Sequence, residues 1–187
     1  MKLWLVRHAQ PLVAAGTCYG RLDVAADPAA TRQCAQALAA RLPHGIRVTS
    51  SPLQRCEQLA PVLSGLRPDL TYSLDARLQE MDFGGWEGRP WQTLATAELQ
   101  AWTDDFAHYA VGGPGHQGES VTAFMARVAS AFDELRREAA APDVLWITHA
   151  GVIRAVNLLA AGQRHITRAD QWPLSAPDYG QWQTMVL

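Results

Sequence analysis

Short apolar runs alternate with amphipathic stretches along this chain. The apolar runs predict buried strands over residues 3–6, 46–49, 70–74 and 144–148, and an edge strand over 181–187. Helix-start signals and helically spaced apolar residues predict helices over 28–41, 52–63, 94–107, 119–141 and 151–161. Stretches with glycine predict loops over 8–27, 78–92 and 108–118. Because strands alternate with helices, the pattern predicts the α/β class, as a three-layer α/β/α sandwich with a mostly parallel sheet.

Two of these helices have a clear start signal. Asp27-Pro28 and Ser51-Pro52 each place an N-cap residue before a proline, which is favoured at the first helical position. The helix at 119–141 has the strongest helical period. One face of it carries Val121, Phe124, Met125, Val128, Phe132 and Leu135, which we predict to be core.

Composition narrows the class of protein. A length of 187 residues fits one domain, and 48% hydrophobic with 18% charged residues excludes a disordered chain. Sixteen basic against 18 acidic residues give a formal charge of −2, which offers no support for general nucleic-acid or anionic-membrane binding. Three cysteines without CxxC spacing, and no signal-type segment, predict a cytoplasmic protein with reduced thiols. No apolar run reaches the length of a membrane span.

Polar residues that can bind phosphate follow two of the buried strands. Arg7 and His8 come after the first strand, and His149 comes after the strand at 144–148. Ligands of such sheets bind beyond the carboxyl ends of the strands, so the fold can bring both histidines together. Arg55 lies near the start of a helix, where the helix N-terminus and a guanidinium both attract phosphate oxygens. Taken singly, each residue also fits a structural role, as a backbone-bonded histidine or a solvated arginine.

Four motifs are spread over nearly the whole chain. They are LVRHA at 5–9, SSPLQRC at 50–56, LQEM at 78–81 and THAG at 148–151. In this order they resemble the histidine phosphatase superfamily, the phosphoglycerate-mutase-like group with an Arg-His-Gly signature. The resemblance implies a phosphoglycerate-mutase-like fold, with residues 1–187 as one histidine phosphatase domain and a helical or loop insertion around 88–118. Ala9 departs from the pattern, because the superfamily usually has glycine there.

Three longer stretches resemble one subgroup of this superfamily. They are GTCYGRLDV at 16–24, QEMDFGGWEG at 79–88 and HAGVIR at 149–154, and they look like segments of bacterial alpha-ribazole phosphatases. A further recurring segment of the superfamily is matched by Gly118, Glu119 and Ser120 with Arg127. The resemblance implies hydrolysis of alpha-ribazole 5′-phosphate, or of the cobalamin 5′-phosphate form, in assembly of the cobalamin lower loop. Trp86 and Trp91 can stack on the benzimidazole, although tryptophans more often serve packing.

The resemblance also implies the roles of the site residues. His8 is the expected nucleophile, which forms a phosphohistidine, and Glu80 is the expected acid and base. The residues expected to hold the phosphoryl oxygens are Arg7, Arg55 and His149, and those expected to contact the rest of the substrate are Tyr19, Gly20 and Arg21. This electrostatic clamp needs no metal ion and implies no cofactor. The implied partner is a small-molecule phosphomonoester.

Sequence spacing alone does not choose the acid. Asp82 and Glu87 compete with Glu80, and the family position favours Glu80. We expect Asp82 and Glu87 to bind backbone amides as turn residues. His8 must attack as a neutral imidazole, and the nearby arginines are expected to disfavour its protonated form.

Other functions stay open on the sequence alone. A broad-specificity phosphatase for sugar phosphates or other small molecules shares the phosphate machinery, and Ala9 motivates a non-catalytic phosphate-binding module. If φ at Ala9 is negative, the methyl group adds little conformational strain. If phosphate binding needs an unhindered amide at this position, the methyl group weakens that binding. A phosphoglycerate mutase is disfavoured because residues 88–118 form a short insertion, and a metallohydrolase because no HExxH motif occurs. Monomer and dimer are both open.

Overall fold

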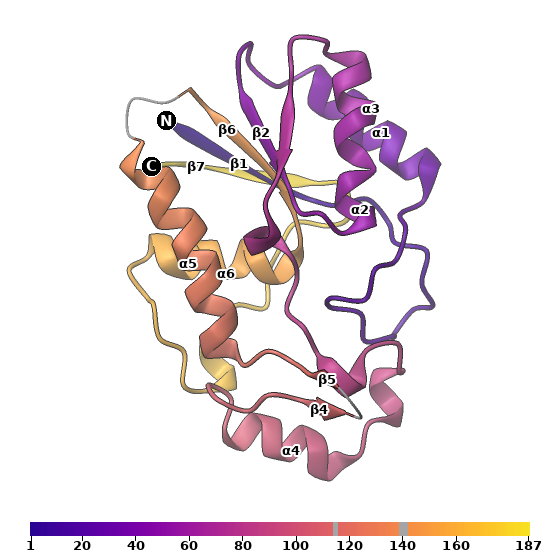
Figure 1. Ribbon diagram of the computed structural model, residues 1–187, viewed down its shortest axis with the longest axis vertical. Coiled ribbons are helices and arrows are strands. Elements are labelled where there is room, and N and C mark those ends of the chain that lie inside the picture. The colour runs from indigo at the N-terminus through magenta and orange to yellow at the C-terminus, as the bar shows by residue number, and fades with distance from the viewer. Residues whose placement is uncertain (114–115, 139–141) are drawn as a thin grey trace.

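A central five-stranded sheet organises the structure (Figure 1). The computed structural model describes residues 1–113, 116–138 and 142–187. The strands are β1 (Lys2–Arg7), β2 (Arg47–Ser50), β3 (Tyr72–Leu74), β6 (Val144–Thr148) and β7 (Trp182–Val186), in the order β3-β2-β6-β1-β7. Neighbouring strands run parallel except β7, which pairs antiparallel with β1 at one edge. The predicted mostly parallel sheet and edge strand are therefore confirmed.

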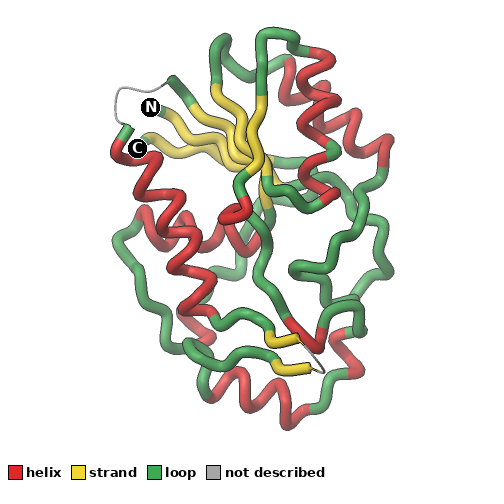
Figure 2. The backbone as a smooth tube through the Cα atoms, in the orientation of Figure 1, coloured by secondary structure: helices red, strands yellow, loops and turns green. Residues whose placement is uncertain are grey.

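Helices cover both faces of the sheet (Figure 2). They are α1 (Pro28–Ala39), α2 (Gln54–Glu57), α3 (Leu59–Leu66), α4 (Thr96–Asp104), α5 (Val121–Arg137) and α6 (Ala150–Ala160). Successive residues of β1 point to opposite faces. Leu3 and Leu5 join the apolar cluster formed with α5 and α6, whereas Trp4 and Val6 join the cluster formed with α1 and α3. The predicted α/β/α sandwich is the observed fold.

The start of α1 follows its sequence signal, and α5 begins two residues later than predicted, with Ser120 as its N-cap. Asp27 Oδ1 accepts a hydrogen bond from Ala30 N at 2.7 Å, and Ser120 Oγ accepts one from Ala123 N at 3.2 Å. The apolar face predicted for α5 is buried along its length. α5 ends earlier than predicted, and residues 139–141 at its predicted end lie outside the described part of the chain.

The single helix predicted after Ser51 is wrong at its start and in its continuity. Leu53 rather than Ser51 is the N-cap of α2, and Gln58 separates α2 from α3. Pro61 accounts for the break, because it has no N–H to donate to the carbonyl four residues earlier. The Ser51 side chain serves the site described below.

Other boundaries also differ from the prediction. β3 is only three residues long, and its side chains are exposed. The loop predicted at 108–118 contains a short antiparallel pair, β4 (Gly112–Gly113) and β5 (His116–Gln117), with residues 114–115 outside the described part. Short 3₁₀ helices lie in the connections at Ala76–Leu78, Gly84–Trp86, Trp91–Thr93 and Ala169–Gln171.

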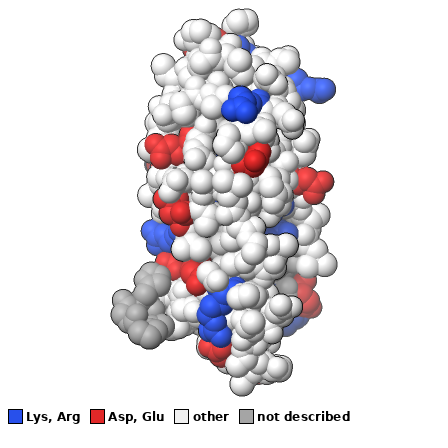
Figure 3. Space-filling view, turned by 90° about the vertical axis from the view of Figure 1, so that its right-hand side faces the viewer, with Lys and Arg blue, Asp and Glu red and all other residues white. Residues whose placement is uncertain are grey.

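Charged residues are scattered over the surface. On the face drawn in Figure 3, basic and acidic side chains are interspersed with uncharged ones rather than gathered by sign. This distribution fits the formal charge of −2. Within the described ranges, no helix combines the length and apolar character needed to cross a membrane.

Candidate active site

The carboxyl ends of β1 and β6 bring the two predicted histidines together. The strands pair with Arg7 opposite Thr148, and His8 N donates to the Thr148 carbonyl at 3.0 Å. The ring centroids of His8 and His149 are 5.3 Å apart. Both histidines therefore lie side by side at the carboxyl ends of neighbouring parallel strands, as predicted.

His8 is buried, and its ring geometry suits nucleophilic attack. Nδ1 lies 2.7 Å from the Ala9 carbonyl, which can only accept, so Nδ1 carries the proton and donates it. Nε2 therefore keeps its lone pair for a phosphorus atom. Burial first, and then Arg55 and Arg7, lower the pKa of His8 to about 3, although the Ala9 bond acts in the opposite direction. His8 is thus neutral at neutral pH, as the expected mechanism requires.

The lowered pKa of His8 makes folding sensitive to acid. His8 takes up a proton near pH 6.5 in the unfolded chain but only near pH 3 in the folded protein. Protonation therefore favours the unfolded chain, so the free energy of unfolding is highest above pH 6.5 and falls as the pH drops towards 3. Between pH 7 and pH 5 we expect the loss from His8 to be about 2 kcal/mol. Urea unfolding at both pH values measures it, and His8→Asn should shrink the difference by that amount. An unchanged difference would contradict a buried neutral His8.

Ala9 does not strain the backbone. Among the described residues, those with a positive φ are all glycines, so Ala9 has a conformation open to any L residue. The φ of Ala9 is therefore negative, and its methyl group costs little in backbone strain.

Arg55 is fully buried and its guanidinium is held by three partners. Nε donates to His149 Nδ1 at 3.2 Å, Nη1 donates to the Leu22 carbonyl at 2.8 Å, and Nη2 donates to the Gly20 carbonyl. A guanidinium has five N–H groups, so two remain for a ligand. Because Arg55 also lines the cavity described below, its geometry fits the predicted role as a phosphate ligand.

His149 lies behind Arg55 rather than on the cavity wall. Its Nδ1 accepts from Arg55, so Nε2 carries the proton and donates to Ser51 Oγ at 2.8 Å. Burial first, and then Arg55, hold its pKa well below the ordinary value. With both ring nitrogens bonded to protein, His149 orients Arg55 in this structure. Its predicted direct contact with phosphate stays a prediction.

Arg7 is held by the segment that precedes β7. Nη1 donates to the Pro177 carbonyl at 3.1 Å, and the guanidinium carbon lies 3.9 Å from the ring centroid of Tyr179. Arg7 Nε is buried and has no partner among the described residues. Sequence reasoning missed Tyr179, which lies outside all the motifs. The Tyr179 hydroxyl in turn lies 2.6 Å from that of Tyr19, a predicted substrate-contacting residue.

Glu80 reaches the cavity with its carboxylate anchored on two amides. Oε2 accepts from Gly151 N at 2.9 Å, in the first turn of α6, and Oε1 accepts from Met81 N at 3.0 Å. A Cβ at position 151 would collide with the Glu80 carboxylate, so any other residue there would displace this carboxylate from its present position. Glu80 lines the same cavity as His8, where an acid for the leaving group belongs.

Arg127 holds the segment that carries Glu80. It forms a bidentate ion pair with Glu119, with N···O distances of 2.7 and 2.8 Å. The same guanidinium donates to the carbonyls of Arg77, Gln79 and Glu80 at 2.9, 2.7 and 3.0 Å. The resemblance singled out this pair without a role, and the structure gives it one: it fixes the backbone from 77 to 80.

We expect Arg127→Met to lower both stability and activity. Glu119 would be left as a largely buried, unpaired carboxylate, at a cost of about 3 kcal/mol. Release of the Glu80 segment should also lower kcat about tenfold or more. Thermal unfolding and ribose 5-phosphate turnover measure the two effects, because the leaving alkoxide of ribose 5-phosphate needs the proton from Glu80. Arg164→Met is the matched control, because its bidentate pair with Asp133 is exposed and should be worth less than about 1 kcal/mol.

Glu87 binds backbone amides, as expected. Its carboxylate accepts from the amides of residues 20–22 at 2.8 to 3.0 Å and from Phe83 N at 2.8 Å. The Arg55 guanidinium donates to two carbonyls of the same loop, those of Gly20 and Leu22. Glu87 thus binds the N–H groups of the loop and Arg55 binds its carbonyl groups, and the loop in turn orients Arg55.

Gly20 and Arg21 do not line the cavity. The Gly20 backbone is bound as described above, and Arg21 is half-exposed, with Nη2 donating to Gln79 Oε1 at 3.0 Å and Nη1 lying 3.6 Å from Asp82 Oδ2. Asp82 Oδ1 accepts from Gly84 N at 2.8 Å, the turn role expected for it. Direct substrate contacts by Gly20 and Arg21 stay predictions.

The cavity at His8 has a volume of about 270 Å³ and two kinds of wall. Its polar side is formed by Arg7, His8, Tyr19, Arg55, Glu80 and Arg154. Its apolar side includes Phe83, Trp91, Trp102, Phe106, Phe124 and Trp172. Trp91 lines the cavity and can therefore stack on a substrate, one of the two roles considered for it from the sequence. Trp86 is instead fully buried, with its ring edge-on to Trp91 and Trp102, and serves packing.

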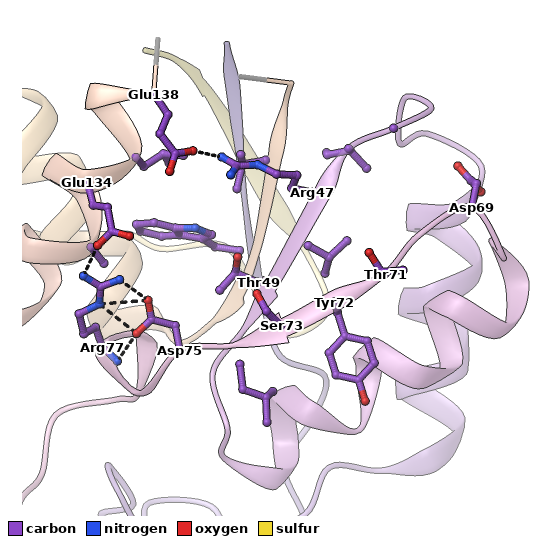
Figure 4. A pocket seen from close by; sticks show the side chains of 18 residues that line it. Arg47, Thr49, Asp69, Thr71, Tyr72, Ser73, Asp75, Arg77, Glu134 and Glu138 are labelled. Atoms are coloured by element: carbon purple, nitrogen blue, oxygen red, sulfur yellow. Dashed lines mark hydrogen bonds and ion pairs between the residues drawn. The ribbon is translucent and has the colours of Figure 1, made fainter. Parts of the chain in front are cut away.

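A larger cavity of about 470 Å³ lies against β2, β3 and α5 (Figure 4). Its arginines are paired with carboxylates: Arg47 with Glu138, and Arg77 with Asp75 and Glu134. No residue predicted for the site lines this cavity. Its size therefore does not make it the better candidate for phosphate chemistry.

Comparison with known proteins identifies the family. The family model described as "Histidine phosphatase superfamily (branch 1)" matches residues 3–183, so the chain belongs to this superfamily. Its members include phosphatases and mutases, and the predicted phosphoglycerate-mutase-like fold is confirmed.

Individual relatives differ in the activity that their names state. "Probable phosphoglycerate mutase GpmB" of Yersinia pestis (strain Pestoides F) is 31% identical over 152 residues, which cover 80% of this chain and 69% of the relative. The crystal structure of TTHB049 from Thermus thermophilus is 29% identical with a TM-score of 0.71, covering 98% of this chain and 92% of that one. Mycobacterial glucosyl-3-phosphoglycerate phosphatase Rv2419c shares the fold, with a TM-score of 0.78 at 24% identity over 98% and 88% of the two chains.

Proposed function

We propose that this superfamily member is a phosphomonoesterase that acts through a phosphohistidine at His8, with alpha-ribazole 5′-phosphate as its substrate. One observation carries the proposal. A buried, neutral imidazole with an unbonded Nε2 lies at the wall of a cavity that Arg7 and Arg55 also line, and both guanidinium groups keep N–H groups for a ligand.

The expected chemistry has two balanced steps. First, His8 Nε2 bonds to phosphorus as the bond from phosphorus to the ester oxygen breaks, and the leaving oxygen takes a proton from Glu80. Then Glu80 takes a proton from water, the water oxygen bonds to phosphorus, and the N–P bond breaks to restore His8. Arg7 and Arg55 offset the charge on the phosphoryl oxygens in both steps.

Charge and shape of the cavity support a substrate with an uncharged aromatic body. The lining contains three arginines and one glutamate, a formal charge of +2 with Glu80 ionised and +3 with Glu80 protonated for the first step, and either charge suits a phosphomonoester dianion. The rest of the wall is largely aromatic, which suits stacking on a benzimidazole. A phosphoglycerate has no aromatic body to pack against this wall.

The relative named as a probable phosphoglycerate mutase favours a second candidate, the turnover of phosphoglycerates and other sugar phosphates. The two candidates share the chemistry at His8 and differ in the substrate body. The fit of that body to the aromatic wall is the feature that separates them.

Phosphate release from a panel of monoesters, with chelator present, tests the proposal. The panel contains alpha-ribazole 5′-phosphate, ribose 5-phosphate, AMP and 3-phosphoglycerate. We expect alpha-ribazole 5′-phosphate to have the highest kcat/KM, about 100-fold above 3-phosphoglycerate. Equal turnover across the panel would remove the specific substrate and keep the phosphatase. No release by the folded protein would favour a non-catalytic phosphate-binding module.

A further inference from the structure

The side chains of Tyr19 and Tyr179 join two segments that are far apart in sequence. Their hydroxyl oxygens lie 2.6 Å apart, and either one can be the donor. Tyr19 belongs to the loop that follows His8, and it lines the cavity at His8. Tyr179 belongs to the turn that precedes β7. Burial first, and then the bond to Tyr179, raise the pKa of Tyr19, so its hydroxyl keeps its proton at neutral pH.

Each ring of this tyrosine pair lies against one of the two arginines proposed to bind phosphate. The guanidinium carbon of Arg7 is 3.9 Å from the ring centroid of Tyr179, and that of Arg55 is 5.4 Å from the ring centroid of Tyr19. Both distances fall within the range in which an aromatic face attracts a cation. The Tyr179 ring also lies 5.5 Å from the His8 ring. The hydrogen-bonded tyrosine pair therefore lies beside His8 and against both arginines, Arg7 and Arg55.

The turn that carries Tyr179 is fixed to the nucleophile strand through its backbone. Gly180 N donates to the carbonyls of Arg7 and His8, at 3.2 and 3.0 Å, and Arg7 N donates to the Gln181 carbonyl at 3.0 Å. Gly180 has a φ of +70°, in the left-handed region that favours glycine. Tyr179 thus has a defined position relative to His8, although no motif of the sequence includes it.

We infer that the Tyr19–Tyr179 pair is a positioning device that sets the affinity of the site for a phosphoryl group. The inference rests on the proposed phosphate site. The two rings hold the arginines in the orientation that receives phosphoryl oxygens, and the hydrogen bond between the hydroxyls holds the rings. Arg7 depends most on the pair, because its remaining side-chain bond is to the Pro177 carbonyl of the same turn. Neither hydroxyl takes part in proton transfer.

Substitutions separate the hydrogen bond from the rings. Tyr19→Phe and Tyr179→Phe each remove the hydrogen bond and keep the ring, so each should raise the Kd for inorganic phosphate about fivefold. The double variant should show the same fivefold rise, because one bond is lost in all three proteins. Tyr179→Leu also removes the ring from Arg7 and should weaken binding about tenfold further. Tyr72→Phe is the matched control, since Tyr72 lines the larger cavity, and it should change nothing.

The experiment titrates wild type and variants with inorganic phosphate, followed by tryptophan fluorescence, and measures KM and kcat with p-nitrophenyl phosphate. We expect Kd and KM to rise together while kcat stays within about twofold. Phosphate binding by the variants equal to that of the wild type would overturn the inference, as would a fall in kcat at unchanged Kd. No phosphate binding by the wild type would overturn the proposed function instead, and this inference with it. If Tyr179→Leu does not fold, the two phenylalanine variants and their double decide the result.

Discussion

Replacing His8 by asparagine is expected to lower kcat for phosphomonoester hydrolysis by about 10⁴-fold or more. The asparagine amide can still donate to the Ala9 carbonyl, the bond that His8 Nδ1 makes in the structure. It has no lone pair at the position of Nε2, so the covalent step is lost while the surroundings are kept. Steady-state turnover of p-nitrophenyl phosphate measures the effect.

The control for this variant is phosphate binding. Because Arg7 and Arg55 are held by partners other than His8, the variant should bind inorganic phosphate within about threefold of the wild type. Loss of activity with retained binding separates the nucleophile from the binding site. Activity above about 1% of wild type, measured on the pure variant, would show that another group attacks the phosphorus.

Replacing Glu80 by glutamine is expected to affect substrates according to their leaving groups. For an alkyl phosphate such as ribose 5-phosphate, whose alkoxide needs a proton, kcat/KM should fall about 10²- to 10⁴-fold. For p-nitrophenyl phosphate, whose leaving group needs little protonation, the fall should stay below about tenfold. Glutamine is close in size to glutamate and still accepts one of the amide bonds that hold Glu80, from Gly151 or Met81.

Glu87→Gln is the matched control for this comparison. Glu87 holds the loop at residues 20–22 and is expected to take no part in proton transfer, so its loss should slow both substrates by the same factor. The ratio of the two kcat/KM values is therefore the readout. If Glu80→Gln leaves that ratio unchanged, Glu80 is not the acid.

The sequence predicts the framework of the site because strand ends are local features. The apolar runs before Arg7 and before His149 predict two buried strands, and parallel pairing then places the residues that follow at one sheet edge. The cap of α1 at Asp27 is equally local, since its side chain binds an amide three residues on. These elements depend on spacing within a few residues, which the sequence displays directly.

The parts that the sequence did not predict depend on contacts between distant segments. Tyr179 reaches Arg7 and Tyr19 through a turn positioned by backbone bonds to β1, and no periodicity reports such a contact. Ser51 illustrates the same limit: its position before Pro52 is typical of an N-cap, yet α2 begins only after Leu53, and the Ser51 hydroxyl accepts from His149 as well as from Leu53 N. Which ring nitrogen of a histidine is bonded is likewise decided by tertiary structure.

The proposed function depends on a phosphohistidine at His8, and rapid-quench labelling detects this intermediate. The wild-type protein is mixed with a ³²P-labelled phosphomonoester, quenched in alkali within milliseconds, digested and sequenced by mass spectrometry. We expect label at His8 that is stable in alkali, labile in acid, and formed at least as fast as kcat. Turnover by the wild type without label at His8 at any quench time, or with label at another residue, would contradict it.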